Sequence, residues 1–298
     1  MAEFFQQLIN GISLGSIYAL IALGYTMVYG ILKFINFAHG EIFMLGAFSG
    51  FYLAGQFGIT SPDITMAIII LLITMMITAI IGALIEKFAY KPLRRSSKLT
   101  VLITAIGVSL FFQYTGQLIF GADPKSFPTL IESTTLQIAN VKISSNQIVV
   151  ILSSVLLMLI LRIIVMKTKT GTAIRAVSNN ITAASLMGIN INNVISFTFI
   201  LGSSMAGAAG ILYAINYPSI DPLMGLLPGL KAFIAAVLGG IGNFPGAALG
   251  GVLIGTIETL TVGYISSTFR DAIAFSILII ILIFKPTGLL GTKEIEKV

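Results

Sequence analysis

The chain has 298 residues, of which 56% are hydrophobic and only 9% are charged, against about 25% charged residues in an average soluble protein. Together with a mean hydropathy of +1.01, this composition predicts an integral membrane protein and argues against nucleic-acid binding, which would need a basic face. The sequence contains no cysteine, so disulfides, thiolate metal sites and cysteine nucleophiles are excluded.

Apolar runs long enough to cross a bilayer recur along the whole chain, since a spanning helix needs about 20 predominantly apolar residues. We expect one all-α polytopic membrane domain over residues 1–298, with eight or nine transmembrane helices. The expected spans are 11–31, 41–57, 64–85, 101–120, 148–165, 193–215, 224–240, 247–265 and 271–284. The second and seventh are short and lie beside glycine or proline, which is typical of broken or re-entrant helices. No basic segment precedes the first span, which we expect to remain in the mature protein.

Three polar residues follow the first span, in the stretch KFINFAHGE at 33–41: Asn36, His39 and Glu41. A charge at the bilayer centre costs about 2.5 to 3.5 kcal/mol on insertion scales, so such residues need an explanation. In one interpretation, Asn36 caps the second helix and Glu41 lies near its positive N-terminal end. In the other, all three residues line a translocation pathway at a broken helix, with Gly40 as the bend.

Basic residues cluster in segments 87–98, 162–175 and 285–297, which are separated by even numbers of expected spans. All three can therefore lie on the cytoplasmic side, as short basic loops do. This arrangement places the N-terminus outside, the C-terminus inside and segment 122–147 outside. Within that external segment, the alternating residues LQIANVKI at 136–143 predict a small β-hairpin.

Isolated charges inside or beside the spans point to polar contacts in the bundle. Glu258 lies near the middle of the eighth span, so we expect it to face the interior or a watery cavity, either on the pathway or in a structural hydrogen bond. Lys231, near the start of the seventh span, is expected to extend outward along its own stem. Glu86 and Lys87 end the third span, where we expect a pair at the membrane interface.

Small residues recur every fourth position in the stretch GGIGNFPGAALGGVLIG. Such residues let helix backbones approach closely in lipid, so this region is expected to pack tightly against other helices. The two series are Gly242, Gly246 and Gly250, and Ala247, Gly251 and Gly255.

Motifs of enzymatic chemistry are missing from the sequence. It has no GxxxxGK[ST] phosphate loop, no HExxH, and no GxSxG with a histidine downstream. A single histidine excludes a histidine-rich metal site. We therefore expect a transport protein that is not an enzyme and binds no metal or cofactor of its own.

The loop at 167–192 resembles the ATPase-coupling loop of ABC importer permeases. In GTAIRAVSNNITAASLMGIN, Thr182, Ala183, Ala184 and Gly188 match the family pattern Glu-Ala-Ala-x-x-x-Gly, with threonine in place of glutamate. The resemblance implies a short helix that enters a groove on an ATPase subunit. Gly171 and Arg175 belong to the same loop, and Arg175 is expected to offer polar contacts at the edge of the groove.

Segments 13–48, 171–190, 230–251 and 285–298 resemble the permeases of high-affinity branched-chain amino acid ABC transporters, in particular the H-type permease subunit. This resemblance implies a permease bundle in a bacterial inner membrane that pairs with a second permease subunit. It also implies two ATPase subunits, which use ATP, and a periplasmic or lipid-anchored binding protein that delivers leucine, isoleucine or valine.

Other functions stay open at this point. Permeases for urea or short amides carry a related asparagine, histidine and glutamate motif. An ion-coupled carrier or passive channel would use Glu258 and the polar residues near Glu41 without ATPases, and would tolerate a substitution such as Ala184→Trp in the loop. A membrane scaffold that transports nothing would leave solute uptake unchanged in Glu258→Gln and in the loop variants.

Overall fold

The computed structural model describes residues 2–59, 61–94, 96–138 and 140–291. The last seven residues of the basic tail lie outside the described residues, as do Arg95 and Ala139. Eleven α-helices occur in the described part: α1 Ala2–Leu32, α2 His39–Gln56, α3 Ile64–Ile85, α4 Lys98–Phe120, α5 Ser145–Lys167, α6 Lys169–Asn179, α7 Ile181–Leu186, α8 Ile191–Asn216, α9 Leu226–Gly239, α10 Phe244–Tyr264 and α11 Arg270–Phe284. A π-helical turn η1 (Glu86–Tyr90) and a 3-10 turn η2 (Lys91–Leu93) extend α3, and a 3-10 turn η3 (Ser267–Phe269) precedes α11.

Seven of these helical segments are long and apolar enough to cross a membrane, counting α3 with its extension to Leu93 and α11 with η3. They coincide with seven of the nine expected spans, which confirms the all-α polytopic fold. The other two expected spans are α2 and α9, the pair with irregular sequences. The 14 residues of α9 cover only about 21 Å at 1.5 Å per residue, less than the bilayer core of about 30 Å.

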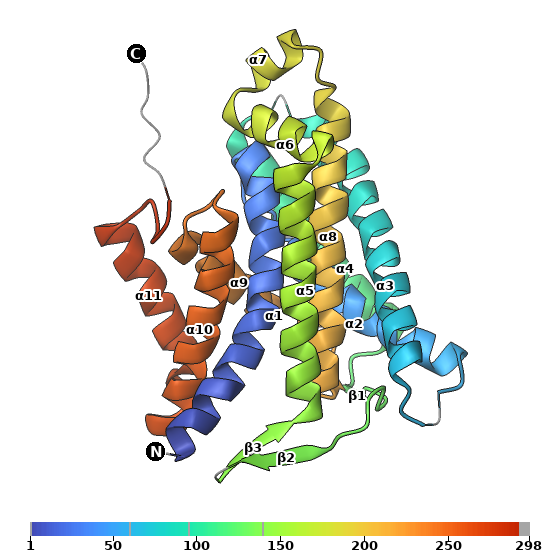
Figure 1. The fold of residues 1–298 in the computed structure, drawn as a ribbon. Coiled ribbons are helices and arrows are strands. Elements are labelled where there is room, and N and C mark those ends of the chain that lie inside the picture. The colour runs from blue at the N-terminus through green and yellow to red at the C-terminus, as the bar shows by residue number, and fades with distance from the viewer. Residues whose placement is uncertain (1, 60, 95, 139, 292–298) are drawn as a thin grey trace.

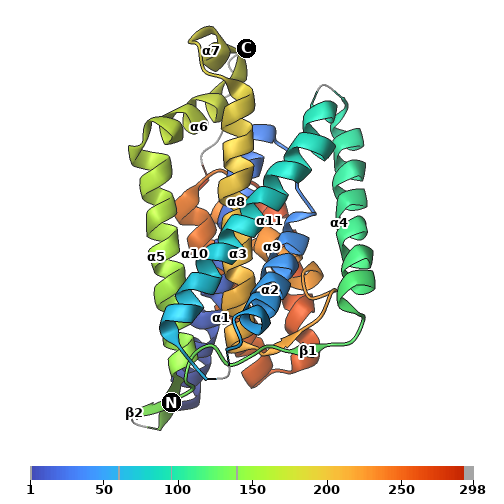
Figure 2. The same ribbon diagram turned by 90° about the vertical axis from the view of Figure 1, so that its right-hand side faces the viewer.

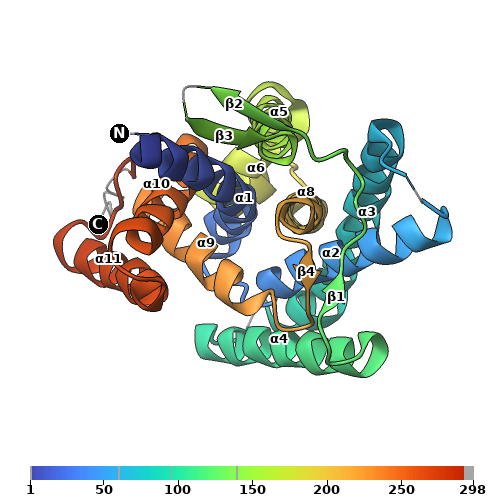
Figure 3. The ribbon, with the colours of Figure 1, turned by 90° about the horizontal axis from the view of Figure 1, so that it is seen from below.

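The centre of the bundle is formed by α1 and α8, as the end-on view in Figure 3 shows. Buried residues make up 94% of the most apolar window of α1 and 78% of that of α8, but 6% of that of α11. The other helices surround this pair, with α10, α9 and α5 packed on α1, and α3 and α2 packed on α8. The two central helices thus make most of the contacts between helices of the bundle. The outer helices leave apolar faces exposed.

Glycines at the predicted four-residue spacing bring α10 against two neighbours. A Cβ atom on Gly251 or Gly255 would overlap the backbone of α1, and one on Gly246 or Gly250 would overlap the backbone of α9. The two series therefore face different helices. Gly242 differs from the expectation, because it lies in the loop between α9 and α10 with φ +92° and has open space around its Cα.

Two small sheets lie at the end of the bundle that holds the N-terminus (Figure 1). Strands β2 (Thr135–Ile138) and β3 (Val141–Ser144) form an antiparallel hairpin at the position of the alternating residues. The side chain of Gln6 accepts a hydrogen bond from Lys142 N at 2.8 Å and donates one to Lys142 O at 2.9 Å, which fixes the hairpin to α1. Strands β1 (Lys125–Ser126) and β4 (Ser219–Ile220) form the second sheet.

The opposite end of the bundle carries α6 and α7, as Figure 1 shows, and the α3–α4 connection lies at this same end in Figure 2. Pro286 and Thr287 of the third basic segment line one cavity with Arg175 of α6. The described parts of the three basic segments therefore gather at one end, and the N-terminus and the hairpin lie at the other. This arrangement is the one that the predicted orientation requires.

Candidate functional site

The polar stretch after α1 forms a turn that lets α2 begin inside the bundle. Lys33 adopts φ +54°, and Ala38 is the N-cap of α2 with no side-chain cap. The prediction that Asn36 caps α2 is therefore wrong. Instead, the buried Asn36 Oδ1 accepts a hydrogen bond from the hydroxyl of Tyr90 at 2.5 Å. Tyr90 ends the π-helical turn η1, an irregularity that is frequent at functional sites.

His39 is buried in the first turn of α2. Its ring packs edge-on against Tyr25 of α1, with 4.7 Å between the ring centroids. Gly24 makes room for the imidazole, because a Cβ atom at that position would overlap the ring. The first turn of α2 therefore packs the His39 ring against α1, in the space that Gly24 leaves by having no side chain.

Glu41 lies in the same turn and is 1% exposed. Its Oε1 accepts hydrogen bonds from Ser109 Oγ at 3.1 Å and from Gln113 Nε2 at 2.8 Å, both from α4. Its Oε2 has no hydrogen-bond partner among the residues that the structure describes. Within that part of the chain, no lysine or arginine forms an ion pair with Glu41.

The N-terminal ends of α2 and α9 meet beside this carboxylate. A Cβ atom on Gly40 would lie 2.5 Å from Gly225 O, and one on Gly225 would lie 3.2 Å from Glu41 Oε2. Gly225 is the N-cap of α9, and it makes no side-chain cap. Two helix starts without a side-chain cap thus meet beside Glu41, and their positive ends favour a negative charge there.

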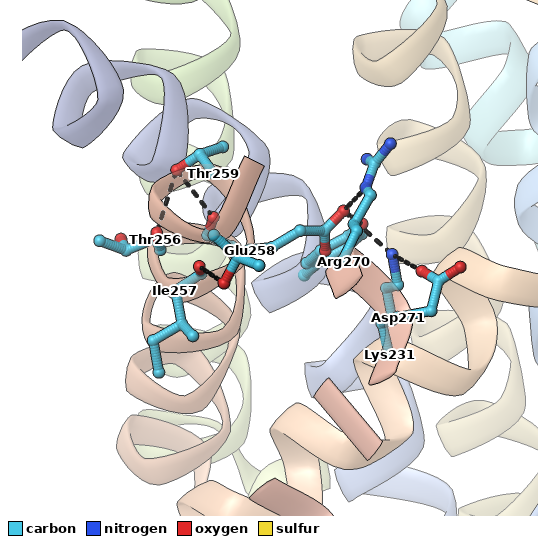
Figure 4. A network of polar contacts seen from close by, with 10 residues as sticks. Lys231, Thr256, Ile257, Glu258, Thr259, Arg270 and Asp271 are labelled. Atoms are coloured by element: carbon cyan, nitrogen blue, oxygen red, sulfur yellow. Dashed lines mark hydrogen bonds and ion pairs between the residues drawn. The ribbon is translucent and has the colours of Figure 1, made fainter. Parts of the chain in front are cut away.

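Glu258 is buried in a different environment, shown in Figure 4. Its Oε1 accepts hydrogen bonds from Lys231 Nζ at 3.0 Å, from Arg270 Nε and from the Tyr18 hydroxyl at 3.3 Å. Lys231 Nζ also lies 2.6 Å from Asp271 Oδ1. These five residues come from α1, α9, α10 and α11, so the network joins four helices.

Two expectations about isolated charges are wrong. Lys231 is 3% exposed and points to Glu258 inside the bundle, so it does not extend outward. Glu86 does not pair with Lys87 at the membrane interface, because Glu86 is buried, forms an ion pair with Arg94 and accepts a hydrogen bond from Ser196 Oγ at 2.7 Å. Lys87 instead lies 5.5 Å from the ring centre of Phe88.

The loop with the small-residue motif forms α6 and α7, which project from the bundle (Figure 1). Gly171 lets α6 pack on the end of α5, since a Cβ atom there would overlap Val165 O. Arg175 donates to the same Val165 carbonyl, so its side chain faces the end of α5 and not the edge of the loop. In α7, Ala184 is buried, whereas Thr182 and Ala183 are exposed. Gly188 ends the motif with φ +81°.

The family described as "Branched-chain amino acid transport system / permease component" matches residues 7–283. The chain belongs to this family. BraD of Pseudomonas aeruginosa, a high-affinity branched-chain amino acid transport system permease protein, is 41% identical over 99% of this chain and 98% of its own length. LivH of Escherichia coli K12, with the same description, is 40% identical over 99% of this chain and 98% of its own. A probable branched-chain amino acid transport permease of Methanocaldococcus jannaschii is 31% identical over 91% and 88% of the two chains.

This membership confirms the resemblance to branched-chain amino acid permeases. Within the permease, the residues singled out in the sequence fall into three separate places. His39 and Glu41 lie in the first turn of α2 and Asn36 lies just before it. Glu258 lies in the network of α1, α9, α10 and α11, and the loop motif lies at the projecting end. The four predicted pathway residues are thus divided, because Asn36, His39 and Glu41 lie near one another and Glu258 lies elsewhere in the bundle.

Two exposed residues of the permease were missed in the sequence. Leu186 and Met187, at the tip of α7, are 84% and 83% exposed. The signal was present, because two large apolar residues stand directly before a glycine in an otherwise small and polar loop. Side chains of this kind, exposed on a short projecting helix, are typical of a contact with another protein.

Proposed function

We propose that the chain is the permease subunit of an ATP-driven importer of leucine, isoleucine and valine. The observation that carries this proposal is the 41% identity, over nearly the full length of both chains, to a permease protein of a high-affinity branched-chain amino acid transport system. The subunit acts with a second permease, two ATPase subunits and a substrate-binding protein. ATP is used by the ATPase subunits, and this chain binds no cofactor.

The end with α6 and α7 is the cytoplasmic end in this proposal. It is supported by the gathering of the basic segments there, since short basic loops stay in the cytoplasm. The N-terminus and the β2–β3 hairpin then face the outside of a bacterial inner membrane, where the binding protein delivers the amino acid.

The tip of α7 is the contact with the ATPase subunits. Leu186 and Met187 supply the apolar surface, and the buried Ala184 fixes α7 on its own loop. Because α6 continues directly from α5, and α7 leads into α8, a push on the tip is transmitted to two membrane helices. Closure of the ATPases would thereby switch the permease between outward and inward openings as a rigid-body movement.

The test is leucine uptake into vesicles that contain both permeases, with the binding protein outside and the ATPases and ATP inside. We expect uptake only with the complete set. Uptake without ATPases would contradict the proposal and favour an ion-coupled carrier. Uptake of urea or acetamide in place of leucine would change the proposed substrate, and the proposed ATP-driven import mechanism would stand.

The contact at α7 is tested in the same vesicles with the double variant Leu186→Asp and Met187→Asp. Both side chains are exposed, so the fold tolerates the change while the apolar contact is lost. We expect ATP-driven uptake to fall at least about tenfold, which is about 1.4 kcal/mol. The control exchanges the two residues, Leu186→Met and Met187→Leu, and should keep uptake. Ala184→Trp is less suitable, because it disturbs the packing of the loop itself.

A further inference from the structure

We propose that Glu41 binds the α-ammonium group of the transported amino acid, at the junction where the N-termini of α2 and α9 meet. The inference rests on the function proposed above and assigns a part of the substrate to a residue. Four features of the junction support it: a carboxylate without a cation, two helix N-termini, apolar neighbours, and the peripheral helix α4 that shields the carboxylate.

The unmatched charge is the first feature. The other buried glutamates in the described part of the chain, Glu86 and Glu258, each form an ion pair with an arginine or a lysine. Glu41 has only the neutral donors Ser109 and Gln113. One oxygen of Glu41 has no hydrogen-bond partner in the described part of the chain, and the same is true of Glu258, so the two differ in the missing cation. A buried carboxylate is costly unless it takes up a proton or meets a cation, so this site favours a ligand that brings a positive charge.

The second feature is the pair of helix ends at the same point. In membrane transporters, broken helices direct their positive N-termini at anionic substrate groups. Here the ends of α2 and α9 are in contact through Gly40, Gly225 and Gly229, and neither carries a side-chain cap. A zwitterion matches this junction, because its ammonium group pairs with Glu41 and its carboxylate is favoured by the helix ends.

The third feature is the surface next to Glu41. One turn beyond Gln113 on α4, Gly116 faces the side chains of Met44 and Pro222, at 3.2 and 3.6 Å from a Cβ built on it. These groups are apolar. Ligand sites commonly combine such walls with a few polar groups that fix the orientation of the ligand, and a branched aliphatic side chain suits this combination.

The fourth feature is the cover over the site. Glu41 is shielded by α4, which lies at the edge of the bundle in Figure 3 and packs mainly on α2 and η1. The bonds from Ser109 and Gln113 are neutral contacts that an ammonium group can replace. A displacement of α4 would therefore open the carboxylate to the substrate, and its return would close the site.

The first experiment measures ATP-driven leucine uptake by the complete complex with Glu41→Gln. This change removes the charge and keeps the size of the side chain. We expect kcat/KM for leucine to fall at least about tenfold, with unchanged assembly of the complex. The matched control removes a buried carboxylate together with its buried cation, Lys231→Met with Glu258→Leu. It leaves the half-exposed Arg270 and Asp271, one positive and one negative group, and should keep more than half of the uptake.

The outcomes separate the two proposals. If the wild-type complex does not take up leucine, the proposed function fails, and this inference fails with it. If the wild type transports leucine and the Glu41→Gln complex does so at a similar rate, only the inference is overturned.

A second measurement uses the unaltered protein, in case the variant fails to fold. Binding of radiolabelled leucine to the permease pair in lipid nanodiscs is measured without the binding protein, and two analogues compete. We expect displacement by 3-methylbutylamine, which keeps the ammonium group, at a concentration at least about tenfold lower than by 4-methylpentanoate, which lacks it. Equal displacement, stronger displacement by the carboxylate, or no saturable leucine binding would overturn the inference.

Discussion

Glu258 and Glu41 are both about 1% exposed inside the same bundle, yet their surroundings differ in charge. Glu258 is held by Lys231 and Arg270, and Lys231 also pairs with Asp271, so the network has as many positive as negative groups. Glu41 is held by a serine and a glutamine. The network around Glu258 is balanced in charge and joins helices, whereas a carboxylate without a cation is suited to a ligand that supplies the missing charge.

Removing a charge has a different effect on the free energy of unfolding at each of the two sites. Removing one member of a buried ion pair leaves a charge without compensation, while replacing the whole pair by apolar residues is often neutral. Removing an unmatched charge eliminates a cost of burial instead. We therefore expect that loss of Glu258 alone lowers stability, whereas loss of the charge on Glu41 lowers transport and leaves stability nearly unchanged.

The largest effect on stability is expected for Glu258→Leu. It leaves Lys231 buried with only the half-exposed Asp271, so the free energy of unfolding should fall by about 3 kcal/mol. Thermal and denaturant unfolding of the purified protein in detergent would measure the loss. Adding Lys231→Met should bring the free energy of unfolding back to within about 1 kcal/mol of the wild-type value. If the double variant is no more stable than the single one, the matched-network account is wrong.

A smaller loss is expected for Arg94→Gln. Arg94 is 16% exposed, so water screens part of its interaction with the buried Glu86, and Ser196 continues to donate to that carboxylate. We expect a loss of about 2 kcal/mol in unfolding free energy. The control Lys87→Gln changes an exposed charge and should stay within about 0.5 kcal/mol. Equal effects of the two substitutions would show that the pair with Arg94 adds nothing.

Ser109→Ala removes one of the two donors to Glu41. Because Gln113 continues to donate to the same oxygen, the expected loss is about 1.5 kcal/mol, the lower range for a hydrogen bond to a charged group. Thr104→Ala, five residues earlier on α4, removes a bond to a backbone carbonyl only and is the matched control. A loss at Ser109 no larger than at Thr104 would count against a charged Glu41.

The smallest effect on stability is expected for Glu41→Gln itself. The substitution removes an unmatched buried charge and keeps an oxygen for Gln113, so the unfolding free energy should change by less than about 1 kcal/mol. Circular dichroism during denaturation would record it. A loss of about 3 kcal/mol or more would mean that Glu41 holds the fold together, as Glu258 does.

Much of this fold is predictable from composition along the chain. Hydropathy alone locates the seven long spans, and the glycine-rich sequences around α2 and α9 indicate that these two differ from the rest. Helix-packing glycines are also recognisable, since Gly246, Gly250, Gly251 and Gly255 do contact neighbouring backbones.

The partners of the polar residues are not predictable in the same way. Tyr18 and Glu258 are 240 residues apart in the chain, and their contact depends on the packing of α1 against α10. The position of Lys231 within a single span predicts a side chain that reaches the membrane surface, because helix packing is not visible from one span. In the structure, the short α9 brings it among α1, α10 and α11, where a carboxylate is available.

The most direct test of this account compares leucine uptake by two variants in one vesicle preparation, Glu41→Gln and the double variant Lys231→Met with Glu258→Leu. We predict that the first complex assembles normally and loses at least about nine-tenths of the wild-type rate, while the second retains more than half of it. The reverse result, with uptake retained in Glu41→Gln and lost in the double variant, would contradict the assignment of Glu41 to the substrate and of Glu258 to the fold.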